Sequence, residues 1–132
     1  IAARYAQQKH GAERVAIVDF DVHHGNGTQD IFYDDPSVLF ASSHQMPLYP
    51  GSGALNETGT GNIFNAPLSD GDDGSKFKEA FRERVLPAVE NFQPDLLMIS
   101  AGFDAHKDDQ LAKLKHYLLI SDQYIEVICQ AN

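Results

Sequence analysis

Apolar and polar residues alternate along the chain in blocks that predict helices and strands in turn. The unbroken apolar run from Val15 to Val18 is typical of a strand buried on both faces, and the strand is expected to cover residues 15–21. Further strands are expected over residues 38–43, 63–68 and 96–100, and helices over residues 2–10, 28–33, 75–92 and 122–130. Strands that alternate with helices predict an α/β fold with a mainly parallel sheet.

Proline and glycine set the limits of several of these elements. Pro87 lies inside the predicted helix 75–92 and should kink or interrupt it, while Pro67 restricts the strand 63–68 to a sheet edge. Residues 45–61 contain two prolines and four glycines, which predicts a long loop. Loops of this length in compact domains are often functional.

Acidic and histidine side chains follow the first apolar strand directly. On an extended chain, Asp19, Asp21 and His23 project to the same side, and Gly25 then lets the chain turn away. Because buried carboxylates are costly unless a cation compensates them, this cluster predicts a metal site. The alternative is a strand end whose acids cap a helix or pair with an arginine elsewhere.

Asp104 is the candidate for the third metal ligand. It follows the predicted strand 96–100, again just past the carboxyl end, which is the edge where ligands collect in open α/β sheets. The alternative is an ordinary N-cap or turn aspartate.

Composition limits the classes of partner. The chain has 132 residues, enough for one domain, and its net charge is −9 with no basic run. This charge argues against direct nucleic-acid binding and suits a cationic partner such as a lysine-rich tail or a polyamine. The single cysteine, Cys129, excludes an internal disulfide and a cysteine-based zinc knuckle. With no long apolar segment or signal-like start, we expect a cytoplasmic protein (nuclear in a eukaryote) without a membrane span.

Four motifs, in order along the chain, resemble the metal-dependent histone deacetylase family. They are DFDVHHGNGTQ from Asp19, SSHQMPLYPGSG from Ser42, GNIFNAPL from Gly61 and DLLMISAGFDAHKDD from Asp95. The resemblance is closest to the class II-like and bacterial members, which include acetylpolyamine amidohydrolases and acetoin-utilisation proteins, because Asn26 stands where class I members usually carry Asp. It implies a three-layer arginase/deacetylase-type α/β fold present only in part, with residues 1–132 an internal piece of a single catalytic domain.

The implied activity is zinc-dependent hydrolysis of N-acetyl amides, in acetyl-lysine peptides and proteins or in acetylated polyamines. Asp21, His23 and Asp104 would hold the metal and leave a position open, and this hard ligand set also accepts Fe²⁺. The family's general-base histidine pair would lie before Ile1 and its oxyanion-stabilising Tyr after Asn132. The piece alone is therefore expected to be inactive.

The resemblance also implies supporting roles. Asn26 and Asp19 resemble residues that orient the two histidines of that pair, although Asn26 is equally typical of a turn between two glycines. Tyr49 resembles the aromatic wall of the acyl-lysine channel, or is an ordinary surface tyrosine in a Pro/Gly loop.

Two monovalent-cation sites follow from the same resemblance. The first is a structural K⁺ site made from oxygens of Asp19, Asp21, His23, Ser42 and Ser43. The second would use the backbone carbonyls of Phe32, Asp35, Val38 and Asn62.

Two other functions remain open. An arginase-like ureohydrolase holds two metals and needs a D-x-H-x-D pattern, whereas Gly25 lies two residues after His23 and His106 two residues after Asp104. A degenerate deacetylase fold could serve as a non-catalytic acyl-lysine-binding scaffold. One metal, two metals or none in the full-length protein would separate these functions; an oligomer is compatible with all of them.

Overall fold

Four parallel strands form the centre of the structure, a computed structural model in which residues 1–105 are described. The strands are β1 (Val15–Asp19), β2 (Val38–Gln45), β3 (Ile63–Leu68) and β4 (Leu96–Ser100), in the order β3-β2-β1-β4. The predicted α/β class with a parallel sheet is confirmed, and β3 lies at a sheet edge as its proline indicated. The predicted helix 122–130 lies outside the described residues, as do Cys129 and His106.

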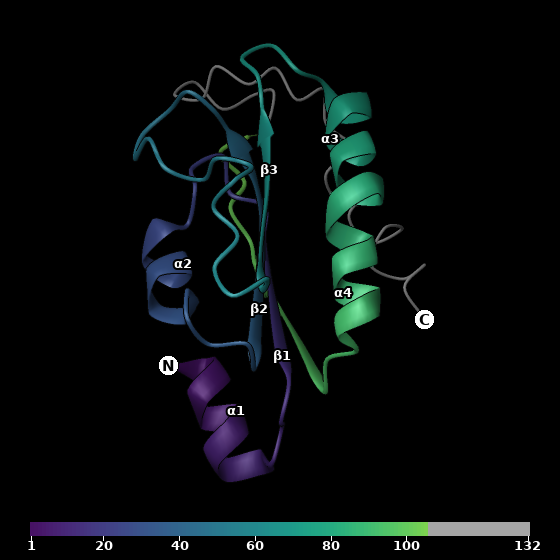
Figure 1. The fold of residues 1–132 in the computed structure, drawn as a ribbon. Helices are drawn as coiled ribbons and strands as arrows, with labels where there is room; N and C mark the ends of the chain where they lie inside the picture. Colours follow the sequence, from purple (N-terminus) through teal and green to yellow (C-terminus); the bar gives the residue numbers. More distant parts are fainter. Residues whose placement is uncertain (106–132) are drawn as a thin grey trace.

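Helices cover both faces of this sheet (Figure 1). On one face a single column contains α3 (Gly74–Ala80), a π-helical turn (Phe81–Val85) and α4 (Leu86–Phe92), and α2 (Asn26–Phe32) lies on the opposite side. The first helix, α1 (Ala2–His10), ends at Gly11, which adopts the left-handed conformation expected of a helix C-cap. The result is the three-layer arrangement that the sequence motifs imply.

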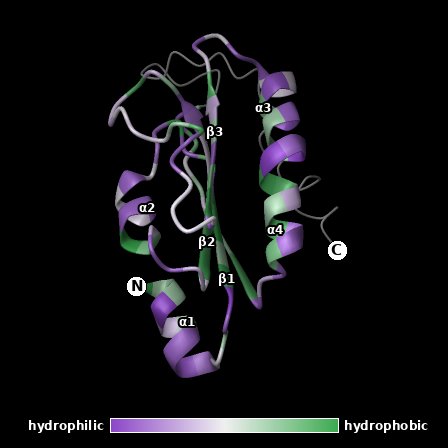
Figure 2. Ribbon diagram, viewed as in Figure 1, coloured by the Kyte–Doolittle hydropathy of each residue, from purple (hydrophilic) through white to green (hydrophobic). Residues whose placement is uncertain are grey.

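The side chains of β1 explain its unbroken apolar run. Ala16 and Val18 pack toward the α3–α4 column, whereas Val15 and Ile17 pack toward α1 and α2. All five residues of β1 are buried, because both faces of the strand are covered. Figure 2 shows the same pattern, with apolar residues concentrated in the strands and polar residues on the outer sides of the helices.

Pro87 interrupts the long helix as predicted. Its ring nitrogen cannot donate a hydrogen bond to the preceding turn, and the helix passes through a π-helical turn over Phe81–Val85 immediately before it. Proline then occupies the first turn of α4, where a missing N–H group is tolerated. Asp73 begins the column by accepting hydrogen bonds from the backbone N–H groups of Ser75 and Lys76.

The predicted end of β1 at residue 21 is wrong, because the strand ends at Asp19. The Asp19 carboxylate accepts a hydrogen bond from the backbone N–H of Asp21 at 3.0 Å, which turns the chain out of the sheet. Asp21 and His23 therefore project from a loop rather than from an extended strand. Two other boundaries also move: β2 continues to Gln45, and α2 begins at Asn26.

Among residues 1–105, no helix is both long and apolar enough to cross a membrane.

Candidate metal centre

Three predicted ligands meet at the carboxyl edge of the sheet. Asp21 and His23 lie on the loop after β1, and Asp104 lies on the segment after β4, the strand that pairs with β1 in parallel. Each offers one ligand atom, and the three atoms lie within 4.8 Å of one another. His23 Nδ1 is 3.1 Å from Asp21 Oδ1 and 2.9 Å from Asp104 Oδ2. The register of β1 with β4 thus brings together residues more than 80 positions apart.

Backbone groups fix the two carboxylates. The N–H of Val22 donates to Asp104 Oδ1 at 3.0 Å, and the N–H of His23 donates to Asp21 Oδ1 at 2.7 Å. At Gly102 a Cβ atom would collide with the Asp21 carboxylate, so a side chain there would displace a ligand. These contacts hold the donor atoms in position before any ion binds.

The donor set fits one divalent transition metal. The side chains of Asp21, His23 and Asp104 are 36%, 45% and 30% exposed, so the cluster is open to solvent on one side. Two carboxylates this close to each other repel unless positive charge lies between them. Three protein ligands with an open face are the pattern of a catalytic zinc site, and Fe²⁺ suits the same oxygen and nitrogen donors. Within residues 1–105 this is the one such group of three or more side chains.

Asp19 is the last residue of β1 and is not part of this cluster. Its side chain is buried, and burial raises the pKa of the carboxyl, an effect that the nearby Asp21 carboxylate reinforces. Asp19 pairs with Ser42 in the β1–β2 register, and both Ser42 and Ser43 are buried. A buried carboxylate beside hydroxyl and carbonyl oxygens is compatible with the predicted K⁺ site, which stays a prediction.

The second predicted monovalent site does not fit a cation as folded. The side-chain nitrogen of Asn62 donates to the carbonyls of Phe32, Asp35 and Val38 at 2.8, 3.0 and 2.8 Å. The carbonyl of Asn62 itself accepts from the N–H of Phe40 at 3.0 Å. All four oxygens assigned to the ion are therefore engaged by the protein.

A buried polar network beside the candidate metal centre was not predicted from the sequence. His24, the residue after ligand His23, contacts Ser52 Oγ through Nδ1 at 2.8 Å and Gln29 Oε1 through Nε2 at 3.0 Å. The Gln29 amide donates to Glu57 Oε2 at 2.6 Å, and the Asn65 amide donates to Gln29 Oε1 at 2.7 Å. A signal existed in the sequence: β2 turns polar at residues 42–45, although all eight of its residues are buried.

Glu57 anchors the long loop to this network. Its carboxylate accepts hydrogen bonds from the backbone N–H groups of Gly53 and Ala54 at 3.0–3.1 Å. Burial alone would raise the pKa of Glu57, but the hydrogen bonds from Ala54, Gln29 and Gly53 outweigh it and lower the pKa. The carboxylate is thus ionised and closes the loop around itself.

The two histidines of the network are neutral at physiological pH. Burial, reinforced by repulsion from His24, lowers the pKa of His44 to about 4. Burial also lowers the pKa of His24. His44 lies between Ser42 Oγ and the carbonyl of Gly53, and its ring centroid is 4.6 Å from that of His24. His44 fastens the loop to β2 and His24 joins it to α2 through Gln29, and neither histidine belongs to the ligand cluster.

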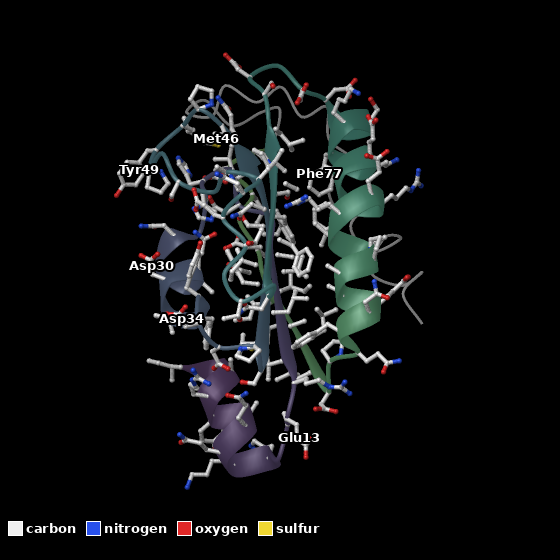
Figure 3. All side chains as sticks on the ribbon, in the orientation of Figure 1. Glu13, Asp30, Asp34, Met46, Tyr49 and Phe77 are labelled. Carbon is white, nitrogen blue, oxygen red and sulfur yellow. The ribbon has the colours of Figure 1, made fainter. Side chains whose placement is uncertain are left out.

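The remaining predicted site residues lie at the surface. Asn26 is exposed at the start of α2. Tyr49 is 80% exposed, and Figure 3 shows its side chain on the outside of the molecule. The preceding residue, Leu48, packs against Val22 and Ala105, each adjacent to a ligand. The loop therefore reaches the candidate metal centre through Leu48, while the role of Tyr49 as a channel wall stays a prediction.

Known proteins are similar to this chain both in sequence and in fold. A family model described as histone deacetylase domain matches residues 1–131. The chain belongs to the histone deacetylase family. Histone deacetylase 10, chloroplastic, from Oryza sativa subsp. japonica is 50% identical over 119 residues, which cover 87% of this chain and 27% of that protein.

Solved structures of deacetylases match this structure closely. The HDA15 HD domain superposes with a TM-score of 0.89 at 39% identity, covering 98% of this chain and 39% of that one. Acetylpolyamine aminohydrolase from Burkholderia pseudomallei gives a TM-score of 0.77 at 37% identity, covering 85% of this chain and 35% of that one. The arginase/deacetylase fold is thus confirmed, and the chain spans well under half the length of these relatives. Membership of this hydrolase family implies a metal cofactor, for which the Asp/His/Asp cluster is the candidate site.

Proposed function

We propose that the protein containing this chain is a metal-dependent deacetylase that hydrolyses N-acetyl amides and releases acetate. Residues 1–132 would form an internal part of its single catalytic domain. One observation carries the proposal: the ligand atoms of Asp21, His23 and Asp104 lie within 4.8 Å of one another on adjacent parallel strand ends.

The cluster suits amide hydrolysis. When bound, Zn²⁺ would polarise the acetyl carbonyl and lower the pKa of a coordinated water. Asp21 and Asp104 contribute two negative charges, so a metal held here would acidify its water less than a metal at an all-histidine site would. A separate general base is therefore needed, and the histidine pair that the family supplies would lie before Ile1.

Residues of this chain would hold that base in position. Asn26 and Asp19 are proposed to accept hydrogen bonds from the histidine pair, and this orients the ring nitrogens that move the proton. A K⁺ ion beside Asp19, Ser42 and Ser43 would compensate the buried carboxylate, whose raised pKa reports its electrostatic cost. The oxyanion-stabilising Tyr would lie after Asn132.

The substrate is proposed to be an acetylated cation. The net charge of −9 favours the approach of acetyl-lysine segments in basic proteins or of acetylpolyamines. An aromatic wall at Tyr49 would contact the aliphatic stem that both substrates share. A cytoplasmic or nuclear location, without direct nucleic-acid or membrane contact, belongs to the same proposal, which leaves the oligomeric state open.

Metal content and deacetylation of the full-length protein test the proposal together. Asp104→Asn should lose both the metal, measured by elemental analysis, and hydrolysis of an acetyl-lysine peptide. Asp30→Asn is the matched control, because it makes the same change at an exposed position of α2 (Figure 3). Full metal occupancy in Asp104→Asn would contradict the ligand assignment. Two metals per wild-type chain would favour a ureohydrolase-like centre, and none would favour a binding scaffold.

A further inference from the structure

Asn62 places its side-chain amide at the focus of three backbone carbonyls. Its nitrogen is 2.8 Å from the oxygen of Phe32 at the end of α2, 3.0 Å from that of Asp35 in the following turn and 2.8 Å from that of Val38 at the start of β2. Asn62 is only 4% exposed. One buried side chain thus ties the connection between α2 and β2 to the start of β3.

The orientation of this amide is fixed by its other end. Asn62 Oδ1 accepts hydrogen bonds from the backbone N–H of Thr60 at 3.1 Å and from Thr60 Oγ1 at 3.0 Å. A flipped amide would bring its oxygen against three carbonyl oxygens and lose both bonds from Thr60. In the observed orientation the two N–H donors of the amide are shared among the three carbonyls.

Three convergent carbonyls are also what a weakly hydrated monovalent cation needs. Backbone carbonyl oxygens replace the hydration shell of K⁺ when they surround it. Each oxygen carries a partial negative charge, and the carbonyls of Phe32 and Asp35 each accept one further hydrogen bond, from the N–H groups of Asp35 and Val38. The convergence of all three oxygens on one point still favours a cation or hydrogen-bond donors there. In this chain the donors come from a neutral side chain.

We infer that the Asn62 amide occupies the place of a monovalent cation, so that the carbonyls of Phe32, Asp35 and Val38 form a latent K⁺ site that the chain itself keeps closed. The connection between α2 and β2 is then held without an ion. Any K⁺ dependence of this protein arises elsewhere. This inference goes beyond the proposed deacetylase activity and does not depend on it.

Removing the amide should open the latent site. The test compares the melting temperature of full-length protein in KCl with that in choline chloride at equal ionic strength. In Asn62→Ala, KCl should raise the melting temperature by a few degrees more than it does in wild type. The reason is that an ion that binds only the folded state stabilises it. Asn62→Asp should show a greater K⁺ dependence still, because its carboxylate adds a negative charge beside the carbonyls that a cation would compensate.

Asn65→Ala is the matched control. Asn65 is fully buried and its amide donates to Gln29 Oε1, so the same atoms are removed from a comparable interior position outside the cage. This variant should lose stability while keeping the K⁺ response of wild type. An Asn62→Ala protein whose K⁺ response equals that of Asn65→Ala would overturn the inference.

Crystals of the full-length wild-type protein soaked with Tl⁺, an anomalous scatterer that substitutes for K⁺, give a test that needs no variant. The inference predicts no anomalous peak among the carbonyls of Phe32, Asp35 and Val38. A peak there, with Asn62 rotated away, would overturn it. Both tests report ion occupancy or stability and not deacetylation, so failure of this inference is distinguishable from failure of the proposed function.

Discussion

His23 and His24 are neighbours in sequence and lie in opposite environments. His23 is 45% exposed and faces the carboxylates of Asp21 and Asp104. His24 is buried, and both of its ring nitrogens contact neutral groups, Ser52 Oγ and Gln29 Oε1. One histidine is left available for an ion, and the other is satisfied by the protein. Ionisable residue types therefore reveal chemistry only when their neighbours are known.

The comparison extends to the two clusters. The open cluster concentrates negative charge at a solvent-exposed edge, which favours a cation from outside. The buried network spreads one ionised carboxylate, that of Glu57, over two backbone N–H groups and the Gln29 amide. The first arrangement is suited to catalysis, whereas the second fixes the long loop beside it.

The largest expected effect separates the two histidines. His23→Ala in the full-length protein should lose its metal and more than about 100-fold of its deacetylase activity, since even changes behind the ligands cost 10–100-fold. His24→Ala should keep its metal and lose roughly 1–3 kcal/mol of unfolding free energy, because buried partners are left unpaired. Elemental analysis and urea unfolding of both variants check this contrast. If His24→Ala lost its metal and His23→Ala kept it, the roles assigned to the two histidines would be wrong.

The next effect concerns pH. His44 is 1% exposed, and its pKa is about 4 in the folded chain and 6.5 in the unfolded chain. Between pH 6.5 and 4, the unfolded chain therefore binds a proton at His44 that the folded chain does not bind. The free energy of unfolding should therefore fall as pH decreases from about 6.5 to 4, by up to roughly 3 kcal/mol. His24 acts in the same direction, while the raised pKa of Asp19 opposes it at the acid end.

Urea unfolding across this pH range measures that loss. His44→Gln should flatten the curve because it removes the titrating ring. His10→Gln, which removes an exposed histidine of α1, should leave the curve unchanged. If His44→Gln retained the full acid-dependent loss, the assignment of that loss to His44 would be wrong.

A charge exchange tests the anchor of the loop. Glu57→Gln turns one carboxylate oxygen into an NH₂ donor, which must face either the Gln29 amide or the N–H groups of Gly53 and Ala54. Gln29→Glu places two carboxylates together. Each variant should lower the free energy of unfolding by about 1–3 kcal/mol. The double variant restores a donor opposite an acceptor, and Gly53 still donates to position 57. Most of the loss should therefore return, and strictly additive losses would show that the two side chains act independently.

The smallest effect is expected at Tyr49. Because its side chain is mostly exposed, Tyr49→Ala should lower kcat/KM for an acetyl-lysine peptide by only several-fold, about 1 kcal/mol, without changing metal content. Tyr5→Ala is the matched control, because Tyr5 is an exposed tyrosine of α1. If kcat/KM were equal in the two variants and wild type, Tyr49 would be an ordinary surface residue with no contact to the substrate.

The sequence predicted the elements whose signal is local. The apolar run from Val15 to Val18 marked a strand covered on both faces, and the acids past β1 and β4 marked the candidate ligands. The end of β1 at Asp19 was missed because it depends on one hydrogen bond, from the N–H of Asp21 to the Asp19 carboxylate.

Features built from distant residues had no such signal. The contacts of Gln29 with Glu57 and Asn65 join positions 28 and 36 residues apart, so only the folded chain reveals that these side chains meet. The same holds for Asn62, whose motif indicated a backbone ligand while its side chain closes the carbonyl cage. Resemblance named the residues of this region without showing what each side chain does.

X-ray absorption at the metal edge of the full-length protein tests the central claim most directly. The account predicts one metal per chain, coordinated by a single imidazole nitrogen with the remaining ligands oxygen. His24→Ala should give the same spectrum as wild type, whereas His23→Ala should give no bound-metal signal. A spectrum that shows two imidazole ligands, a sulfur ligand or scattering from a second metal would contradict it.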